Sequence, residues 1–348
     1  MKTFVTFILA GCLFSISQAT ILTVCPNSSF PAKYTSIQTA IDSSAVGDTI
    51  YIYPGSYSEN PVINKRLVLI GPGINPRRPT KLTATVYDFT VTGTSSSGSV
   101  IMGLNMYHTV QFGIGAEIVN YLLISECKFS GGVNFNGYGN LLENCILSST
   151  YPTGGSIVFT FGSAVGNIIQ NCIIHGYIAM RGGTNTVFRN NIFASGDAGT
   201  SAFSDIQYGE TWGTSVLVEN NIFFKSNPTG PRGSTSACEF KNNIYFLTDN
   251  PVPSNSLSSG NINADPQFVS FPAGGAGFDF SYDYHLQSSS PGVNYGTDGS
   301  DVGMWGGSAP VNAGFEPPIP RVYSLKTKNS IAPAGGKIQL TIKATKAQ

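Results

Sequence analysis

A six-residue pattern recurs along the middle of the chain and limits the folds that the chain can adopt. Each copy begins and ends with an apolar residue, and the copies start at Ile101, Ile124, Leu142, Ile169, Phe188, Val218 and Phe240. From Cys127 to Asn243, successive fourth positions are separated by 18, 27, 19, 30 and 22 residues. A copy this short cannot bury a core alone, so neighbouring copies must stack on one another.

The residue types in each copy predict a strand, a sharp bend and a second strand. The third position is mostly Asn, with Gly103 in the earliest copy, and these residues tolerate a left-handed backbone, so the bend is expected there. The fourth position is expected to form a ladder in which thiols pack and amides hydrogen-bond between coils. The ladder residues are Cys127, Cys145, Cys172, Asn191, Asn221 and Asn243. The uneven spacing places the additional residues in external loops.

Copies that run in the same sense favour parallel stacking over a sandwich of antiparallel hairpins. Hairpins would carry recurrent two-residue turns, and the sequence has one Asn-Gly pair, Asn136-Gly137. Parallel crossovers are right-handed in nearly all known cases. The sequence therefore predicts an all-β fold, a right-handed parallel β-helix (a solenoid) over residues 49–307.

The N-terminal end of the solenoid is expected to be covered, because an open stack exposes unpaired strand edges. Within an N-terminal segment of residues 20–48, residues 34–44 predict a short capping helix over the first coil, with Thr35 and Gln38 as a capping box.

The C-terminal part departs from the repeat. Residues 263–307 are rich in Gly, Ser, Pro and Asp and are expected to form irregular final coils. Residues 308–348 predict a proline-rich linker and a β tail, with one strand of a terminal hairpin or edge over residues 337–343.

Residues 1–19 predict a signal peptide. Lys2 precedes an apolar run that is too short to span a bilayer, and small residues end at Ala19. A lipoprotein anchor at Cys12 is the less favoured alternative, because the apolar run continues beyond that cysteine. We expect a secreted, extracellular protein with no membrane span.

Charge and cysteine content exclude some partners and sites. The chain has 19 Lys and Arg and 19 Asp and Glu, with no basic stripe, which argues against a nucleic-acid partner. Loss of the leader would leave five cysteines without a Cys-x-x-Cys spacing, so neither a zinc site nor a complete disulfide framework is expected.

Both ends of the repeat region resemble a known family. Tyr34–Ile41, Gly47–Ile50 and Pro54–Glu59 resemble the opening of the pectate-lyase-like right-handed β-helix superfamily, and Asp265–Val269 and Asp301–Gly303 resemble the closing segment of its secreted bacterial members. The resemblance covers about residues 30–307 and implies the fold and a polysaccharide partner. It carries over no catalytic residue, because the Asp-Asp pair and Gly-His-Gly of polygalacturonases and the later motifs of pectin methylesterases are missing.

The longest insertion, between Asn191 and Asn221, holds the strongest candidates for chemistry, which are Asp197, Asp205, Tyr208, Glu210 and Trp212. Carboxylates beside aromatic rings suit a sugar-stacking surface with Tyr208 and Trp212, a calcium site with Asp197 and Asp205, or both. The alternative is a surface loop that Trp212 anchors to the coils.

His175 and Arg181 follow the Cys172 copy and could supply a base and a carboxylate clamp. The alternative is a solvent-exposed or hydrogen-bonded pair. Two functions stay open. In the first, a secreted protein binds polysaccharide and, as an enzyme, acts as a lyase or hydrolase through His175, Arg181, Asp205 and Glu210. In the second, a non-catalytic scaffold serves in adhesion or at the cell surface.

Overall fold

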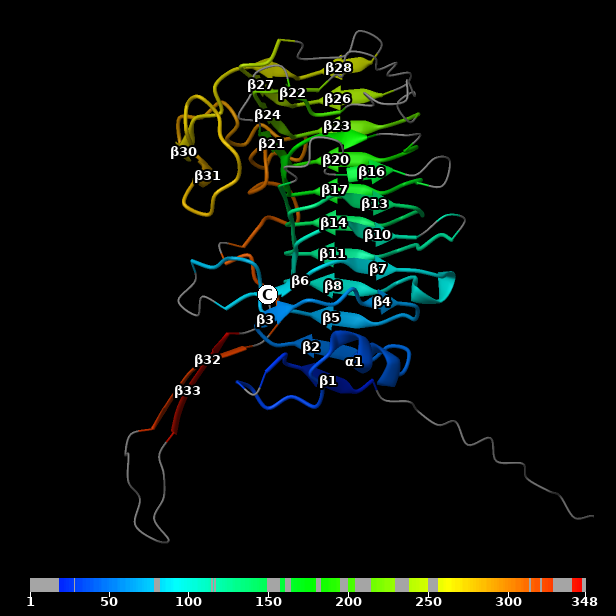
Figure 1. Cartoon of the computed structure of the whole chain (residues 1–348). Coiled ribbons are helices and arrows are strands. Elements are labelled where there is room, and N and C mark those ends of the chain that lie inside the picture. The colour runs from blue at the N-terminus through cyan, green and yellow to red at the C-terminus, as the bar shows by residue number, and fades with distance from the viewer. Residues whose placement is uncertain are drawn as a thin grey trace, which may run out of the picture.

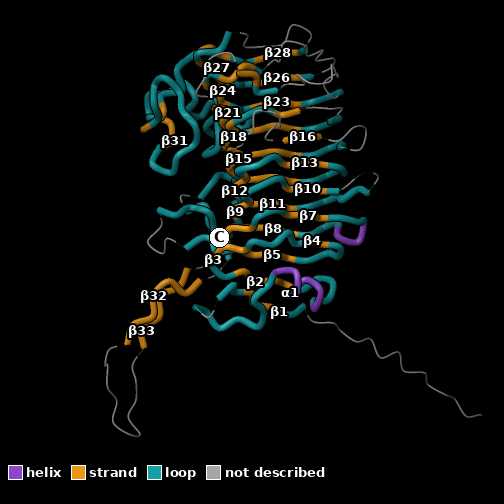
Figure 2. Tube along the Cα trace, viewed as in Figure 1, coloured by secondary structure: helices purple, strands orange, loops and turns teal. Residues whose placement is uncertain are grey.

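The chain winds into a stack of parallel coils (Figure 1). The structure is a computed structural model, and it describes residues 19–27, 29–77, 82–113, 115, 117–148, 157–159, 164–179, 183–194, 200–203, 214–228, 238–249, 256–312, 314–319, 321–327 and 340–345. Three long sheets run along the stack, and loops join them at the corners (Figure 2). We name the sheets A, B and C in the order in which each coil passes through them.

Sheet A has eleven strands, in the order β1 (Ile21–Val24), β2 (Thr49–Ile52), β5 (Val68–Ile70), β8 (Val100–Met102), β11 (Leu123–Ser125), β14 (Leu141–Glu143), β17 (Ile168–Gln170), β20 (Val187–Arg189), β23 (Leu217–Glu219), β26 (Glu239–Lys241) and β28 (Leu257–Ser259). Sheet B has ten, in the order β3 (Gly55–Tyr57), β6 (Ala84–Val86), β9 (Asn105–Met106), β12 (Lys128–Phe129), β15 (Ile146–Ser148), β18 (Ile173–His175), β21 (Ile192–Ala194), β24 (Ile222–Phe224), β27 (Ile244–Phe246) and β29 (Ile262–Asn263).

Sheet C has six strands, in the order β4 (Val62–Ile63), β7 (Phe89–Val91), β10 (Val110–Phe112), β13 (Val133–Phe135), β16 (Ile157–Phe159) and β19 (Ile178–Ala179). A separate parallel pair is formed by β22 (Thr200–Ser201) and β25 (Ser226–Asn227). Strands pair in parallel and in register with the repeat, so that Ile124 lies beside Leu142 and Leu142 beside Ile169. The predicted right-handed parallel β-helix is therefore confirmed.

The bend between sheets A and B lies at the third position of the repeat, as predicted. All seven third-position residues have φ between 47° and 69°, and they are Gly103, Glu126, Asn144, Asn171, Asn190, Asn220 and Asn242. Gly103 also needs to be small, because an added Cβ would lie 2.5 Å from Pro317 and 2.9 Å from the carbonyl oxygen of Gly71. An eighth copy that the sequence analysis missed places Gly260 at φ 61°.

The fourth-position residues form one continuous file of hydrogen bonds. The backbone N–H of Asn191 donates to Oδ1 of Asn221 at 2.9 Å, and that of Asn221 donates to Asn243 at 2.9 Å. Each side-chain amide also donates to the next Oδ1 and to a backbone carbonyl, as Asn221 Nδ2 does to Asn243 (3.0 Å) and Phe188 (2.9 Å). Asn261, in the missed copy, ends the file.

The three ladder cysteines continue the same file with thiols. The backbone N–H groups of Cys127 and Cys145 each point to the Sγ of the next cysteine at 3.4 Å, and that of Cys172 donates to Asn191 Oδ1 at 3.0 Å. All three thiols are reduced and fully buried. Burial raises the pKa of the Cys145 thiol well above its usual range, so it stays protonated. These cysteines therefore serve as ladder and core residues.

Stacking also orders the interior. Phe193, Phe223 and Tyr245 are the last residues of successive repeats, and their rings stack with centroids 4.7 and 5.3 Å apart. The first and last positions of the repeat point into this core, as predicted, and dispersion between stacked rings adds to their burial.

The N-terminal cap differs in detail from the expectation. Helix α1 spans Ile37–Ser43, and its N-cap is Ser36, whose side chain accepts from the N–H of Thr39, so the capping box predicted at Thr35 and Gln38 is wrong. The carboxylate of Glu59 accepts from the Ile37 N–H and the Ser36 hydroxyl, both at 2.7 Å. This acceptor satisfies the helix N-terminus from a neighbouring coil and fixes the register of the cap.

The irregular final coils expected over residues 263–307 are not present. After β29 the chain turns back along the stack, and we name residues 264–319 the strap. The strap contains an antiparallel pair, β30 (Phe268–Ser270) and β31 (Asp283–Leu286), which lies beside the upper coils, and the last part of the strap runs down towards the lower coils (Figure 1). A second antiparallel pair, β32 (Arg321–Thr327) and β33 (Leu340–Thr345), follows it and corresponds to the predicted β tail.

The strap packs on an apolar stripe of sheet B. The fifth position of the repeat points outward and is isoleucine in six consecutive copies, of which Ile262 is partly buried and five are fully buried, namely Ile146, Ile173, Ile192, Ile222 and Ile244. Strap side chains cover them, including Phe268, Tyr284, Val302 and Met304. The strap thus builds a second core outside the solenoid.

The strap is also held by the bend residues. Asn171 Nδ2 donates to the carbonyl oxygens of Met304 (3.0 Å) and Gly306 (2.7 Å), and Asn242 Nδ2 donates to that of Tyr295 (2.8 Å). The bend asparagines therefore supply a left-handed turn and a donor at the same time. No helix within the described residues has the length and apolar character needed to cross a membrane.

The ladder predicts a large cost for an interior substitution. Asn221→Ala would leave the backbone N–H of Asn191 without its acceptor and would remove the amide that donates to the Phe188 carbonyl, both in a dry interior, so we expect the free energy of unfolding to fall by about 3 kcal/mol in urea denaturation. Asn261→Ala at the partly exposed end should cost only about 1 kcal/mol, because water reaches the orphaned groups. Equal losses at both positions would contradict the ladder's role.

We expect that a single charged substitution in the isoleucine stripe detaches the strap from sheet B. Ile192→Lys would bury an unpaired ammonium, so chymotrypsin should cleave the strap roughly tenfold faster or more while the far-ultraviolet circular dichroism of the coils is retained. Val187→Lys, on the outward face of sheet A in the same coil, is the matched control and should leave the cleavage rate unchanged. Similar cleavage of both variants would show that the stripe does not hold the strap.

Candidate functional site

Two pairs of exposed tyrosines lie at the two corners that flank sheet C, one where the chain enters the sheet and one where it leaves it. Tyr87 and Tyr107 are 43% and 56% exposed, and Tyr121 and Tyr138 are 61% and 41% exposed. Large aromatic side chains at such exposure contribute little to folding, so they are candidates for ligand contacts.

The first pair arises from the register of sheet B. Val86 pairs with Met106 at the ends of β6 and β9, so the next residues, Tyr87 and Tyr107, stack one coil apart with ring centroids at 5.8 Å. The imidazole of His108 stacks on Tyr87 at 4.1 Å, and its Nδ1 lies 3.9 Å from Oδ1 of Asp88. The three rings form a continuous aromatic platform with one ion-pairing group at its side.

The second pair lies where sheet C leads back to sheet A. The backbone N–H of Tyr121 donates to the carbonyl oxygen of Tyr138 at 3.1 Å, and the two rings meet edge to face at 5.2 Å. Gly139 allows this contact, because an added Cβ would lie 2.8 Å from the Tyr121 ring. Tyr107 therefore precedes β10 in the chain and Tyr121 follows it, so this strand of sheet C has an exposed tyrosine on each side.

Between the two pairs, the outer face of sheet C carries neutral polar side chains. Thr90, Gln111 and Asn134 are the central residues of β7, β10 and β13, and they are aligned in register and half-buried. They offer hydroxyl and amide groups that can both donate and accept hydrogen bonds. We name the two tyrosine pairs and these three residues the tyrosine face.

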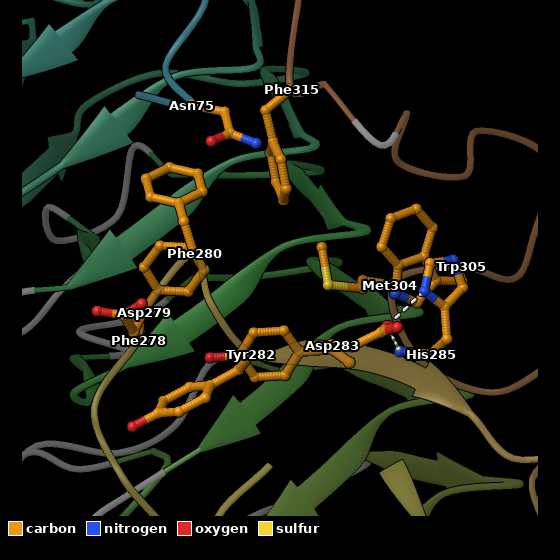
Figure 3. Close-up of a pocket in the computed structure, with 11 residues that line it drawn as sticks. Asn75, Phe278, Asp279, Phe280, Tyr282, Asp283, His285, Met304, Trp305 and Phe315 are labelled. Carbon is orange, nitrogen blue, oxygen red and sulfur yellow. Dashed lines mark hydrogen bonds and ion pairs between the residues drawn. The ribbon is translucent and has the colours of Figure 1, made fainter. Parts of the chain in front are cut away.

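A separate cavity of about 160 Å³ lies within the strap, and we name it the strap pocket (Figure 3). Its lining residues are Asn75, Phe278, Asp279, Phe280, Tyr282, Asp283, Tyr284, His285, Met304, Trp305 and Phe315. Oδ1 of Asp283 lies 2.6 Å from His285 Nδ1 and accepts the His285 backbone N–H at 3.0 Å. The imidazole stacks on the Trp305 indole with centroids 3.7 Å apart.

Both carboxylates of the strap pocket have a basic neighbour. Partial burial raises the pKa of Asp283, but hydrogen bonds from the backbone and ring of His285 outweigh it, so the pKa is below its usual range. The Ser281 hydroxyl and backbone N–H lower the pKa of Asp279, and Arg77 lies 3.3 Å from the same carboxylate. The pocket therefore carries ionised but compensated carboxylates.

The predicted site residues are placed only in part. His175 lies on β18, facing outward, and an added Cβ on Gly277 of the strap would lie 3.7 Å from its Nε2, so its imidazole lies beneath the strap. The other candidates, Arg181, Asp197, Asp205, Tyr208, Glu210 and Trp212, lie outside the described residues. Within the described ranges, no three His, Cys, Asp or Glu residues are grouped as metal ligands.

The sequence analysis missed both sites described above. Tyr87 and Tyr107 stand directly after matching strands of consecutive coils, so aligning the residues that follow each repeat could have revealed their stacking. The strap pocket has no such signal, because its walls come from a segment that does not repeat.

Comparisons with known proteins add little about activity. No protein-family model matches the chain, and no curated protein is similar to it in sequence. Among solved structures, pectate lyase Pel9A is similar, with 14% identity and a TM-score of 0.38 over 86% of this chain and 98% of that one. The pectin methylesterase from Aspergillus niger in deglycosylated form has 16% identity and a TM-score of 0.32 over 76% and 93%. Such likeness concerns the fold alone.

The Asp283–His285 pair predicts a pH dependence of stability. Because the pKa of Asp283 is lowered in the folded state, its contribution is present above the unfolded value of about 4 and is lost as the pH falls through the folded pKa. Asp283→Asn should therefore lower the thermal midpoint at pH 7 and not at pH 2, measured by circular dichroism. A difference between variant and parent that persists at pH 2 would rule out the charge as its cause.

Proposed function

We propose that this protein is exported and binds a polysaccharide along the tyrosine face. The observation that carries the proposal is the arrangement of exposed tyrosines on both sides of a strip of neutral hydrogen-bonding side chains. Pyranose rings have apolar faces that stack on aromatic rings, while their hydroxyl groups exchange hydrogen bonds with amides and hydroxyls. Such a surface suits several sugars in a row, because its contacts repeat from coil to coil.

The central strip of this face, between the tyrosine pairs, favours binding over cleavage. Hydrolysis of a glycosidic bond needs two carboxylates at a fixed separation, and the outward residues Thr90, Gln111 and Asn134 are neutral. Binding without cleavage also agrees with the second candidate function, a non-catalytic scaffold. Export through a leader at residues 1–19 is part of the proposal.

Any lyase or hydrolase activity is assigned to the loop of residues 196–214, with calcium as the cofactor that its carboxylates would take. The assay is release of reducing or unsaturated ends from acidic and neutral polysaccharides. Activity that Asp205→Ala and Glu210→Ala leave unchanged would remove this loop from the proposal.

The tyrosine face predicts a specific loss of binding. The double variant Tyr87→Ala and Tyr107→Ala should weaken binding of a retained polysaccharide by about fivefold or more, since two stacking contacts contribute roughly 1–3 kcal/mol together. Affinity electrophoresis in gels containing single polysaccharides measures this loss. Tyr53→Ala, which breaks a stacked pair with Phe30 elsewhere on the surface, is the matched control. Retardation equal to the parent in every gel would refute the proposal.

A further inference from the structure

We propose that the strap pocket is a second binding site, separate from the tyrosine face, and that it takes one neutral sugar ring. The pocket lies against sheet B, whereas the tyrosines flank sheet C, so the two sites can be tested independently. Four properties of the pocket support the inference, namely its aromatic walls, its unpartnered donors, its charge and its size.

Aromatic rings make up the walls. Phe278 and Phe280 meet edge to face with ring centroids 4.7 Å apart (Figure 3). Phe278 also stacks on Tyr284 with centroids 6.0 Å apart. Phe278 and Phe280 precede β31 in the chain, and Trp305 and Phe315 follow it. All four side chains line the same cavity. Rings held rigidly by one another present flat apolar surfaces, which match the C–H faces of a sugar ring.

Two buried donors have no acceptor. Tyr284 is 5% exposed, and within the described part of the chain neither its hydroxyl proton nor Nε1 of Trp305 has an acceptor, while the backbone of Asp279 interacts with the Tyr284 hydroxyl oxygen. Burial raises the pKa of the Tyr284 hydroxyl, so it keeps its proton. Unsatisfied buried donors are costly and uncommon, which points to a ligand that brings acceptor oxygens.

An acceptor is available at the same pocket. Both hydrogen bonds from His285 reach Oδ1 of Asp283, so its second oxygen, Oδ2, can accept a hydroxyl group from a ligand. Donors and an ionised acceptor beside aromatic walls are the set of groups that a polyhydroxylated ring requires.

Charge and size narrow the ligand. Arg77 lies 3.3 Å from Asp279, and Asp283 faces His285. Burial lowers the pKa of Lys128, whose Nζ lies 6.0 Å from the Phe280 centroid, and the charge of Asp279 offsets part of this shift. Compensated charges favour a neutral sugar over a uronate. A volume of about 160 Å³ is well above the ~10–15 Å³ that one water needs, so the cavity has room for a ring-sized ligand.

Tryptophan fluorescence can report on this pocket directly. The chain has two tryptophans, so Trp212→Phe leaves Trp305 as the single reporter and also removes the loop candidate. Titration with methyl β-glucopyranoside, methyl β-galactopyranoside and methyl α-mannopyranoside should change the Trp305 emission with at least one of them at millimolar concentration.

Tyr284→Phe separates binding from folding. Removing the hydroxyl should weaken binding of the responding glycoside by about tenfold, while the thermal midpoint should change little, because the hydroxyl proton has no protein acceptor to lose. Tyr295→Phe is the matched control in the strap, since its hydroxyl donates to the Gly260 carbonyl at 2.9 Å, and it should bind as the parent does. The double variant Tyr87→Ala and Tyr107→Ala should also keep full binding.

Three results would overturn the proposal. The first is no emission change with any of the three glycosides. The second is equal affinity of Tyr284→Phe and its parent. The third is tighter binding of glucuronate than of the neutral glycosides, which would reject the assigned ligand class. Loss of polysaccharide retardation alone, with glycoside binding intact, bears only on the tyrosine face.

Discussion

The structure depends on the requirement that polar groups inside a stack of coils find partners in the coils next to them. Asn191, Asn221 and Asn243 meet this requirement with amides that accept from one coil and donate to another. Cys145 and Cys172 meet it with sulfur. Because every ladder group is both donor and acceptor, sliding one coil along its neighbour by one residue would leave buried groups unpaired. The ladder therefore fixes the register of the coils without help from the loops.

That fixed register explains why the outside of the solenoid can be specialised face by face. The outward positions of β15, β18, β21, β24 and β27 on sheet B are isoleucines that pack against the strap, whereas the outward positions of β7, β10 and β13 on sheet C are neutral and polar between exposed tyrosines. Both sets are aligned by the same pairing of coils. One face was used to attach a segment of the chain itself, and another stays accessible to solvent.

The sequence was sufficient for the fold because each repeat position has a physical role that its residue type reveals. Asn at the third position indicates the left-handed bend, and the ladder follows from small polar residues at the fourth. The strap was missed, although five isoleucines at the fifth position signal it: they alternate with inward residues, so they must face outward, and outward apolar residues need a cover. The capping residue was misplaced by one, because Glu59 comes from a distant segment. The strap pocket depends on contacts within a non-repeating segment, which no periodicity encodes.

The return path of the strap has a kinetic consequence. Coil-to-coil contacts join residues about one repeat apart, whereas Asn171 reaches Gly306 across 135 positions and Asn220 reaches Thr297 across 77. Closing such long loops is entropically expensive until the coils already present a surface to dock on. The coils should form first, one upon another, and the strap should dock last. The isoleucine stripe of sheet B is therefore covered only after the stack is complete.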